Sequence, residues 1–87
     1  MRGEITNAFL LAGRGTVITV RLTEGTVQPG DSIVCPLKDG ETRSLCVDAI
    51  ELIDHHSPSQ TELGLVVQGI EPGDIAIGDD IRNFDER

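Results

Sequence analysis

The residues best suited to chemistry in this sequence are two adjacent histidines, two cysteines and several carboxylates. His55 and His56 follow Asp54 directly. Adjacent side chains on an extended segment point in opposite directions, so the two imidazoles do not converge on one metal ion. Cys35 and Cys46 lack the further ligands that a zinc site requires. We therefore expect no metal site.

The carboxylates and hydroxyls give no stronger indication of catalysis. Asp79 and Asp80 are adjacent, and Glu71 precedes Asp74 within one short segment, but glycoside hydrolysis requires two carboxylates that flank a pocket. The serines have no evident base partner for nucleophilic catalysis. No GxxxxGK[ST] sequence is present, so a phosphate-binding loop would lack its lysine. We expect a protein that is not an enzyme, with no catalytic residue and no cofactor.

The elements that position these residues are short β-type segments separated by turn signals, a pattern typical of a sandwich or small barrel. In the segment TVITVRL, alternation puts Ile18, Val20 and Leu22 on one face. The apolar phase of residues 42–53 slips near Ala49, which predicts a bend or bulge there. No segment shows a convincing helical pattern. The expected strands are residues 4–11, 16–22, 32–37, 42–53, 63–70 and 75–84.

The length of 87 residues fits one domain, which we expect to span residues 1–87. The only aromatic residues are Phe9 and Phe84, so the core must consist of valine, isoleucine and leucine. A small barrel is filled by its own side chains. Ligands are therefore expected on its outside.

The net charge of −8 is unevenly distributed. Residues 1–43 hold five acidic and five basic residues, whereas residues 44–87 hold ten acidic and two basic residues. Such a field repels phosphates and anionic lipid and suits a basic protein surface. The alternative is that the charge serves solubility alone.

No apolar run approaches the ~20 residues of a membrane helix, and the N-terminus lacks the features of a signal peptide. These features predict a cytoplasmic protein with no membrane partner. Cys35 and Cys46 are then reduced by default. A disulfide between them remains the alternative, since they flank an expected hairpin almost symmetrically.

Four segments in order carry a resemblance to a known family: GRGTVITVRLTEGTVQPGD (13–31), VDAIEL (47–52), LGLVVQGI (63–70) and IAIGDDI (75–81). Together they resemble the second domain of elongation factor Tu and related translation GTPases, from about Phe9 to Ile81. The resemblance implies an all-β fold, a small closed six-stranded antiparallel β-barrel. It also implies a domain that performs no chemistry and stands here without a GTPase domain.

The resemblance singles out three candidate ligand or RNA contacts. Glu51 matches a glutamate that lies near the terminal adenosine of tRNA in elongation factors, and Arg14 and Arg21 match arginines of the family motif. The alternatives are a solvated strand residue for Glu51 and surface ion pairs for the arginines. Val20 departs from the pattern, because the family usually has glycine there, and adds bulk near a close backbone approach.

Two functions of different classes follow. The first hypothesis is a stand-alone, non-enzymatic binding module that contacts a basic protein through its acidic surface. The alternative is a translation-related domain that binds the acceptor end of tRNA, or an excised domain of a longer translation GTPase. Seven basic against fifteen acidic residues disfavour nucleic acid as a partner. We expect a monomer or a dimer, with residues 42–53 as the edge that would pair.

Overall fold

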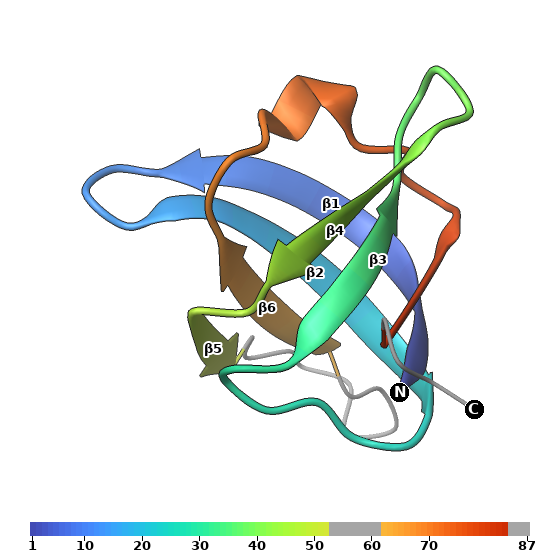
Figure 1. The fold of residues 1–87 in the computed structure, drawn as a ribbon. Helices are drawn as coiled ribbons and strands as arrows, with labels where there is room; N and C mark the ends of the chain where they lie inside the picture. The colour runs from blue at the N-terminus through green and yellow to red at the C-terminus, as the bar shows by residue number, and fades with distance from the viewer. Residues whose placement is uncertain (53–61, 84–87) are drawn as a thin grey trace.

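The computed structural model describes residues 1–52 and 62–83, which form seven strands and one short 3-10 helix (Figure 1). The strands are β1 Arg2–Leu11, β2 Gly15–Glu24, β3 Ser32–Pro36, β4 Thr42–Cys46, β5 Ala49–Leu52, β6 Glu62–Val67 and β7 Asp80–Asn83, and the helix is η1 Pro72–Asp74.

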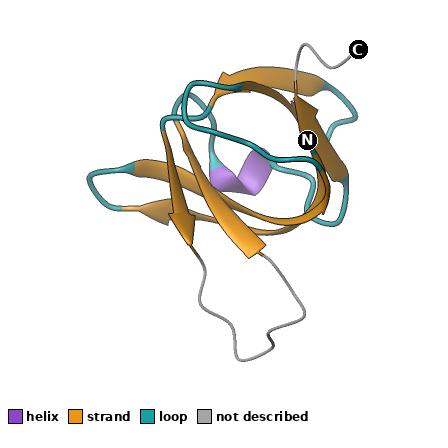
Figure 2. Cartoon of the chain, turned by 90° about the horizontal axis from the view of Figure 1, so that it is seen from below, coloured by secondary structure: helices purple, strands orange, loops and turns teal. Residues whose placement is uncertain are grey.

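All seven strands belong to one antiparallel sheet, in the order β4-β3-β7-β1-β2-β6-β5. The sheet curves around a common axis, with η1 at its far end in the view of Figure 2. The long β1–β2 hairpin projects to one side. The two outermost strands, β4 and β5, are not hydrogen-bonded to each other.

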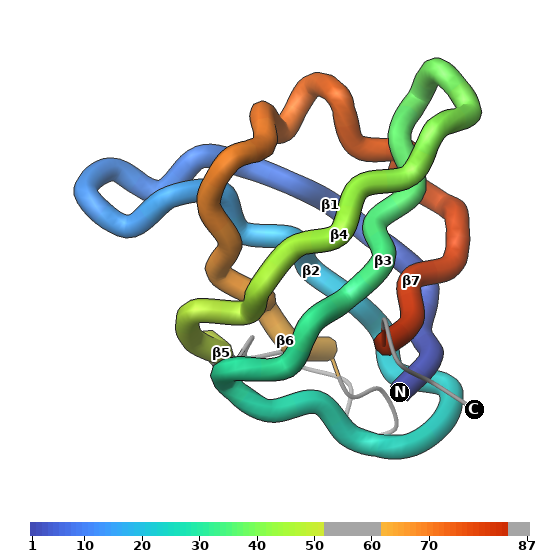
Figure 3. Tube along the Cα trace, in the orientation of Figure 1, coloured from blue at the N-terminus to red at the C-terminus, as the bar shows by residue number. Residues whose placement is uncertain are grey.

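The predicted all-β class is confirmed, but the closed six-stranded barrel is wrong in strand number and in closure. The expected strand 42–53 divides at Val47 and Asp48 because their amides bond to different neighbours. Val47 N–H donates to Asp31 (2.9 Å), and Asp48 N–H donates to Val66 (2.8 Å). The chain therefore passes from the β3 side of the sheet to the β6 side at this bend (Figure 3). β4 and β5 lie on either side of the bend and form no ladder that would close a barrel.

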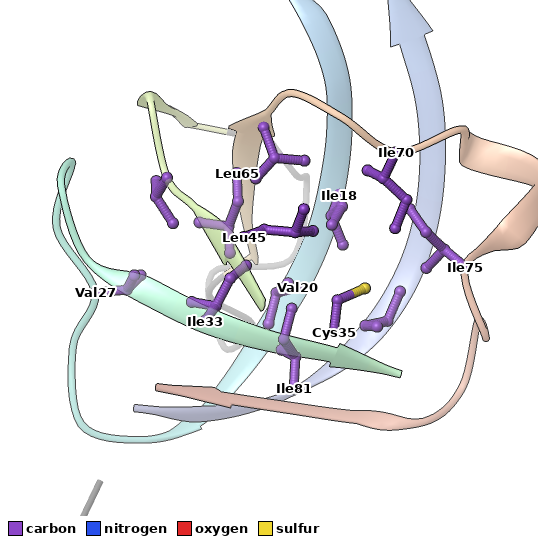
Figure 4. Close-up of a cluster of buried hydrophobic side chains, with 13 residues drawn as sticks. Ile18, Val20, Val27, Ile33, Cys35, Leu45, Leu65, Ile70, Ile75 and Ile81 are labelled. Carbon is purple, nitrogen blue, oxygen red and sulfur yellow. The ribbon is translucent and has the colours of Figure 1, made fainter. Parts of the chain in front are cut away.

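The core contains no aromatic residue among those described; its side chains come from alternating positions of the strands (Figure 4). Phe9 is 39% exposed and Phe84 lies outside the described residues. The core cluster comprises Ile5, Ile18, Val20, Val27, Ile33, Cys35, Leu45, Val47, Leu65, Val67, Ile70, Ile75 and Ile81.

The two Pro-Gly-Asp segments fold differently. At the first, Gly30 has φ of 96° and Asp31 N–H donates to Gln28 (3.1 Å), which is a four-residue turn. The second, Pro72–Asp74, forms η1 instead. The two segments are therefore no structural repeat.

The last two strands are shorter than expected. The expected strand 63–70 ends at Val67, and the expected strand 75–84 is reduced to β7 and an isolated antiparallel bridge between Ile75 and Leu37. Residue 84 lies outside the described residues. Within the described part of the chain, no helix has the length and hydropathy needed to span a bilayer.

Candidate functional site

The strand register places Arg21 and Glu51 on one outer surface of the sheet, at which the hairpin residue Arg14 also arrives. Directly paired residues point to the same side of a sheet. Glu51 pairs with Gly64, which pairs with Thr19, and Arg21 follows Thr19 by two residues. We call this outer surface of β1, β2, β6 and β5 the ion-pair face.

Arg14 and Glu51 meet directly on the ion-pair face. The Arg14 guanidinium lies 2.6 Å from the Glu51 carboxylate, and the two side chains are 48% and 40% exposed. Arg14 comes from the turn between β1 and β2, and Glu51 comes from β5. The Gln68 amide also donates to the carbonyl of Arg14, which ties the turn to the end of β6.

Gly15 permits the close approach of this turn to β6. Its φ is 127°, and a Cβ there would lie 2.5 Å from the Gln68 Nε2 atom and 2.7 Å from the Val67 carbonyl oxygen. An L side chain fits neither the angle nor the space. This tight connection therefore requires a glycine at position 15.

Arg21 lies on the same face but belongs to a second ion pair. Its guanidinium contacts the carboxylate of Glu4, its partner across β1 and β2, and its other cross-strand partner is Glu62 on β6. The three predicted contacts thus share one face but form two separate ion pairs, because Arg14 and Arg21 each have their own carboxylate.

The floor of the ion-pair face is apolar and buried. Val17 and Val66 are 1% and 2% exposed, although they point away from the core. They are direct partners in the β2–β6 register. On the outer face they lie between the hairpin turn and the paired residues Thr19, Gly64 and Glu51. Alternation in the sequence predicts such valines as outward residues, but nothing in it predicts that they are covered.

A bulge in β1 places the Thr6 hydroxyl beside Thr19 on the ion-pair face. The register shifts between Ile5 and Asn7, which leaves Thr6 without a direct partner in β2. The Thr6 hydroxyl lies 2.9 Å from the Thr19 hydroxyl and also bonds to the Glu62 carboxylate. Sequence reasoning missed Thr6, because its role depends on the bulge.

Val20 lies on the inner side of β2, so its bulk does not reach the ion-pair face. Val20 is fully buried and points into the core. Its inner neighbour across the sheet is Gly3, where an added Cβ would lie 2.4 Å from a Val20 methyl carbon. The missing side chain of Gly3 therefore makes room for Val20.

The two cysteines are both free, although they lie on paired strands. Cys35 faces the core and pairs in register with Arg43, whereas Cys46 is exposed and pairs with Ser32. Burial raises the pKa of the Cys35 thiol from 9.0 to about 11, which the positive charge of Arg43 partly offsets.

A second candidate region lies where the sheet fails to close. A hollow of about 300 Å³ separates Arg43 of β4 from the chain that continues beyond β6, and its lining includes Leu10, Gln68, Glu71 and Asp74. The Arg43 guanidinium crosses this gap and donates to the Gly69 carbonyl (2.9 Å). We call the free edge of β4 together with this hollow the β4 seam.

The remaining chemistry-bearing residues form no cluster in the described part of the chain. Asp79 and Asp80 are exposed, and no group of three or more histidine, cysteine or carboxylate side chains within residues 1–52 and 62–83 is placed to hold a metal ion. Asp54, His55 and His56 lie outside those residues.

No protein-family model matches the chain. Translation initiation factor IF-2 from Desulfovibrio desulfuricans is 41% identical over 70 residues, which are 80% of this chain and 7% of the relative. Elongation factor 1-alpha from Nanoarchaeum equitans is 39% identical over 85 residues, 91% of this chain and 19% of the relative. Initiation factor IF-2 from Desulfosudis oleivorans is 35% identical over 80 residues, 92% of this chain and 9% of the relative.

The chain therefore spans between 7% and 19% of the length of these three relatives. Its 87 residues contain no GxxxxGK[ST] phosphate-binding loop sequence. Two findings confirm the predicted resemblance: the sequence identity to translation factors and the all-β fold. Over most of its own length, the chain is therefore similar to one short segment of these translation factors.

Proposed function

We propose that the domain binds the acceptor end of an RNA in translation, with Arg14 and Glu51 as the contacts for its terminal nucleotide. Two observations support the proposal. Two of the three residues that the family resemblance singles out, Arg14 in the β1–β2 turn and Glu51 on β5, meet at 2.6 Å. The relatives are initiation and elongation factors of translation.

The ion pair offers the chemistry that a terminal nucleotide requires. A carboxylate accepts hydrogen bonds from ribose hydroxyls, and a guanidinium donates two parallel bonds to a phosphate. The 2′-hydroxyl distinguishes RNA from DNA. Both side chains are nearly half exposed, so a ligand reaches them without any change in the sheet.

The net charge of −8 limits how such binding is achieved. Each phosphate neutralised on a single strand contributes a slope of about −0.7 to the dependence of log K on log salt. One or two contacts near Arg14 give a slope of about −1, far shallower than that of a protein with a basic groove. The proposal therefore predicts weak binding that rests on hydrogen bonds to the last nucleotide.

Filter binding with aminoacylated and deacylated tRNA at low salt tests the proposal. Glu51→Gln removes the charge but keeps the shape, and we expect it to lower affinity at least tenfold, because hydrogen bonds to a charged group contribute about 1.5–3 kcal/mol. Asp79→Asn is the matched control: it makes the same change at an exposed carboxylate of the β7 side and should leave affinity within twofold.

Two results would contradict the proposal. One is the absence of tRNA binding at low salt. The other is an equal loss in Glu51→Gln and Asp79→Asn, since that would mean that overall charge, and not the site, controls the affinity.

A second function is proposed from a different observation: contact with a basic protein through the acidic surface. The segment from Glu71, which directly precedes η1, to the start of β7 carries four carboxylates, and none of them forms an ion pair within the described residues. Unpaired surface carboxylates attract a basic partner and raise its association rate. The four are Glu71, Asp74, Asp79 and Asp80.

A further inference from the structure

We infer that the free edge of β4 is a docking site for an extended, basic segment of another protein, which adds as a strand to the sheet. This inference rests on the second proposed function and names its surface. Strand addition to an exposed sheet edge is a general mode of peptide recognition, in which backbone hydrogen bonds supply affinity and side-chain positions supply specificity.

The backbone of β4 is half unsatisfied. Residues Thr42–Cys46 pair with β3 on one side only. On the other side, none of their N–H or C=O groups bonds to another backbone group among the described residues. β5 is the opposite edge of the sheet, but it is shorter, and its Glu51 already holds Arg14.

The β4 edge has one charged residue, Arg43, but lacks several other features that protect edge strands from pairing. Its register with β3 runs over five pairs without a bulge, and it contains no proline or lysine. The residues on its outer face are short and uncharged, namely Thr42, Ser44 and Cys46, and all three are exposed. An incoming strand therefore meets neither bulk nor a charge on this face.

Charge decides the chemistry of the partner. Glu41 and Asp48 lie just beyond the two ends of β4, and Glu71 and Asp74 lie across the hollow. None of the four forms an ion pair within the described residues. The cation on β4, Arg43, already donates to a backbone carbonyl. An extended segment with alternating lysine or arginine residues complements these four carboxylates in charge.

The hollow gives the segment a place for an apolar side chain. It has a volume of about 300 Å³, and Leu10, Thr16 and Ile70 contribute to its lining. Leu10 is 67% exposed, which is the largest exposure of any large hydrophobic residue in the described part of the chain. Covering Leu10 therefore adds a favourable apolar contact to the edge pairing.

The test uses a short capped peptide of alternating lysine and valine as the probe, with its glutamate–valine counterpart as control. Backbone amide shifts of the full chain report where each peptide binds. We expect the lysine peptide to perturb β4 and the hollow, and the glutamate peptide to bind at least tenfold more weakly. Affinity should fall as salt is raised.

Two variants localise the effect. Ser44→Lys places a repelling charge on the edge and should lower affinity several-fold, without loss of fold because Ser44 is exposed. Glu71→Gln with Asp74→Asn should lower affinity about three- to tenfold. The matched control, Glu4→Gln with Glu24→Gln, makes the same change in net charge on β1 and β2 and should stay within twofold.

The outcomes distinguish docking at the β4 edge from the broader proposal that the acidic surface binds a basic protein. If the lysine peptide binds but perturbs another surface, or if Ser44→Lys has no effect, the β4 edge is not the site and the acidic protein-binding function stands. If the lysine peptide does not bind at low salt, both are overturned. A concentration-dependent dimer that Ser44→Lys abolishes would assign the edge to a second copy of the chain and also overturn the inference.

Discussion

The ion-pair face and the β4 seam belong to one sheet but differ in how their charges are satisfied. On the ion-pair face, Arg14 of the β1–β2 turn pairs with Glu51 on β5, and Arg21 on β2 pairs with Glu4 on the neighbouring β1, above a floor of buried valines. At the β4 seam, Glu71 and Asp74 have no ion pair within the described residues, and the strand edge is open. The first region has its partners within the chain, whereas the second presents groups to a partner from outside.

The largest expected effect tests whether the two faces of the sheet contribute differently to stability. Ile18 points into the core, and its neighbour Val17 points to the ion-pair face. Ile18→Ala should lower the free energy of unfolding by about 2–5 kcal/mol, and Val17→Ala by about 1–2 kcal/mol. Urea unfolding followed by far-UV circular dichroism measures both, since the chain has no tryptophan or tyrosine. Equal losses would show that the floor of the ion-pair face packs as a second core.

Gly15→Ala should have the next largest effect, because Gly15 ends the turn that positions Arg14. The angle φ of 127° and the 2.5 Å approach to Gln68 both oppose a Cβ, so we expect a loss of about 1–3 kcal/mol. Gly13→Ala is the control: φ there is 78° and no atom lies within 4 Å of the added Cβ. It should cost about 1–2 kcal/mol from backbone conformation alone. An equal cost at both positions would mean that the contact with β6 contributes nothing.

The thiols distinguish the core side of β3 from the exposed edge of β4. Because the pKa of Cys35 is raised from 9.0 to about 11, the unfolded chain releases this proton at lower pH than the folded protein. Stability should therefore fall as pH rises from 9 to 11 and then level off. Cys35→Ala should remove this part of the pH dependence and Cys46→Ala should keep it. A thiol reagent at pH 8 should modify Cys46 quickly and Cys35 only on unfolding; two fast thiols would contradict the structure.

The sequence predicted local features of this fold well, because they depend on local chemistry. The alternation in TVITVRL placed Ile18 and Val20 on one face, and the structure places both in the core. The division of 42–53 was anticipated as a bend but not as a change of partner strand. That change depends on the bonds of Val47 and Asp48 to distant carbonyls, which no local pattern encodes.

The candidate site was predictable in its residues but not in its pairing. Family resemblance identified Arg14, Arg21 and Glu51, and one proposed alternative, surface ion pairs for the arginines, describes their contacts. Which carboxylate each arginine would meet depends on register across four strands. The β4 seam was not predicted, because it arises from incomplete closure of a sheet that was expected to close.

The smallest expected effect is the coupling within the two ion pairs, and it tests whether the ion-pair face is held together by charge. Double-mutant cycles with Arg14→Gln and Glu51→Gln, and with Arg21→Gln and Glu4→Gln, should each give about 0.2–1 kcal/mol, because exposed pairs are screened by water and salt. Raising the salt concentration should reduce both couplings. A pair this weak opens readily for a ligand, as the proposed RNA contact requires. A coupling well above this range for Arg14 and Glu51 alone would indicate that the pair is structural, and a nucleotide would then have to compete with it at a substantial cost in affinity.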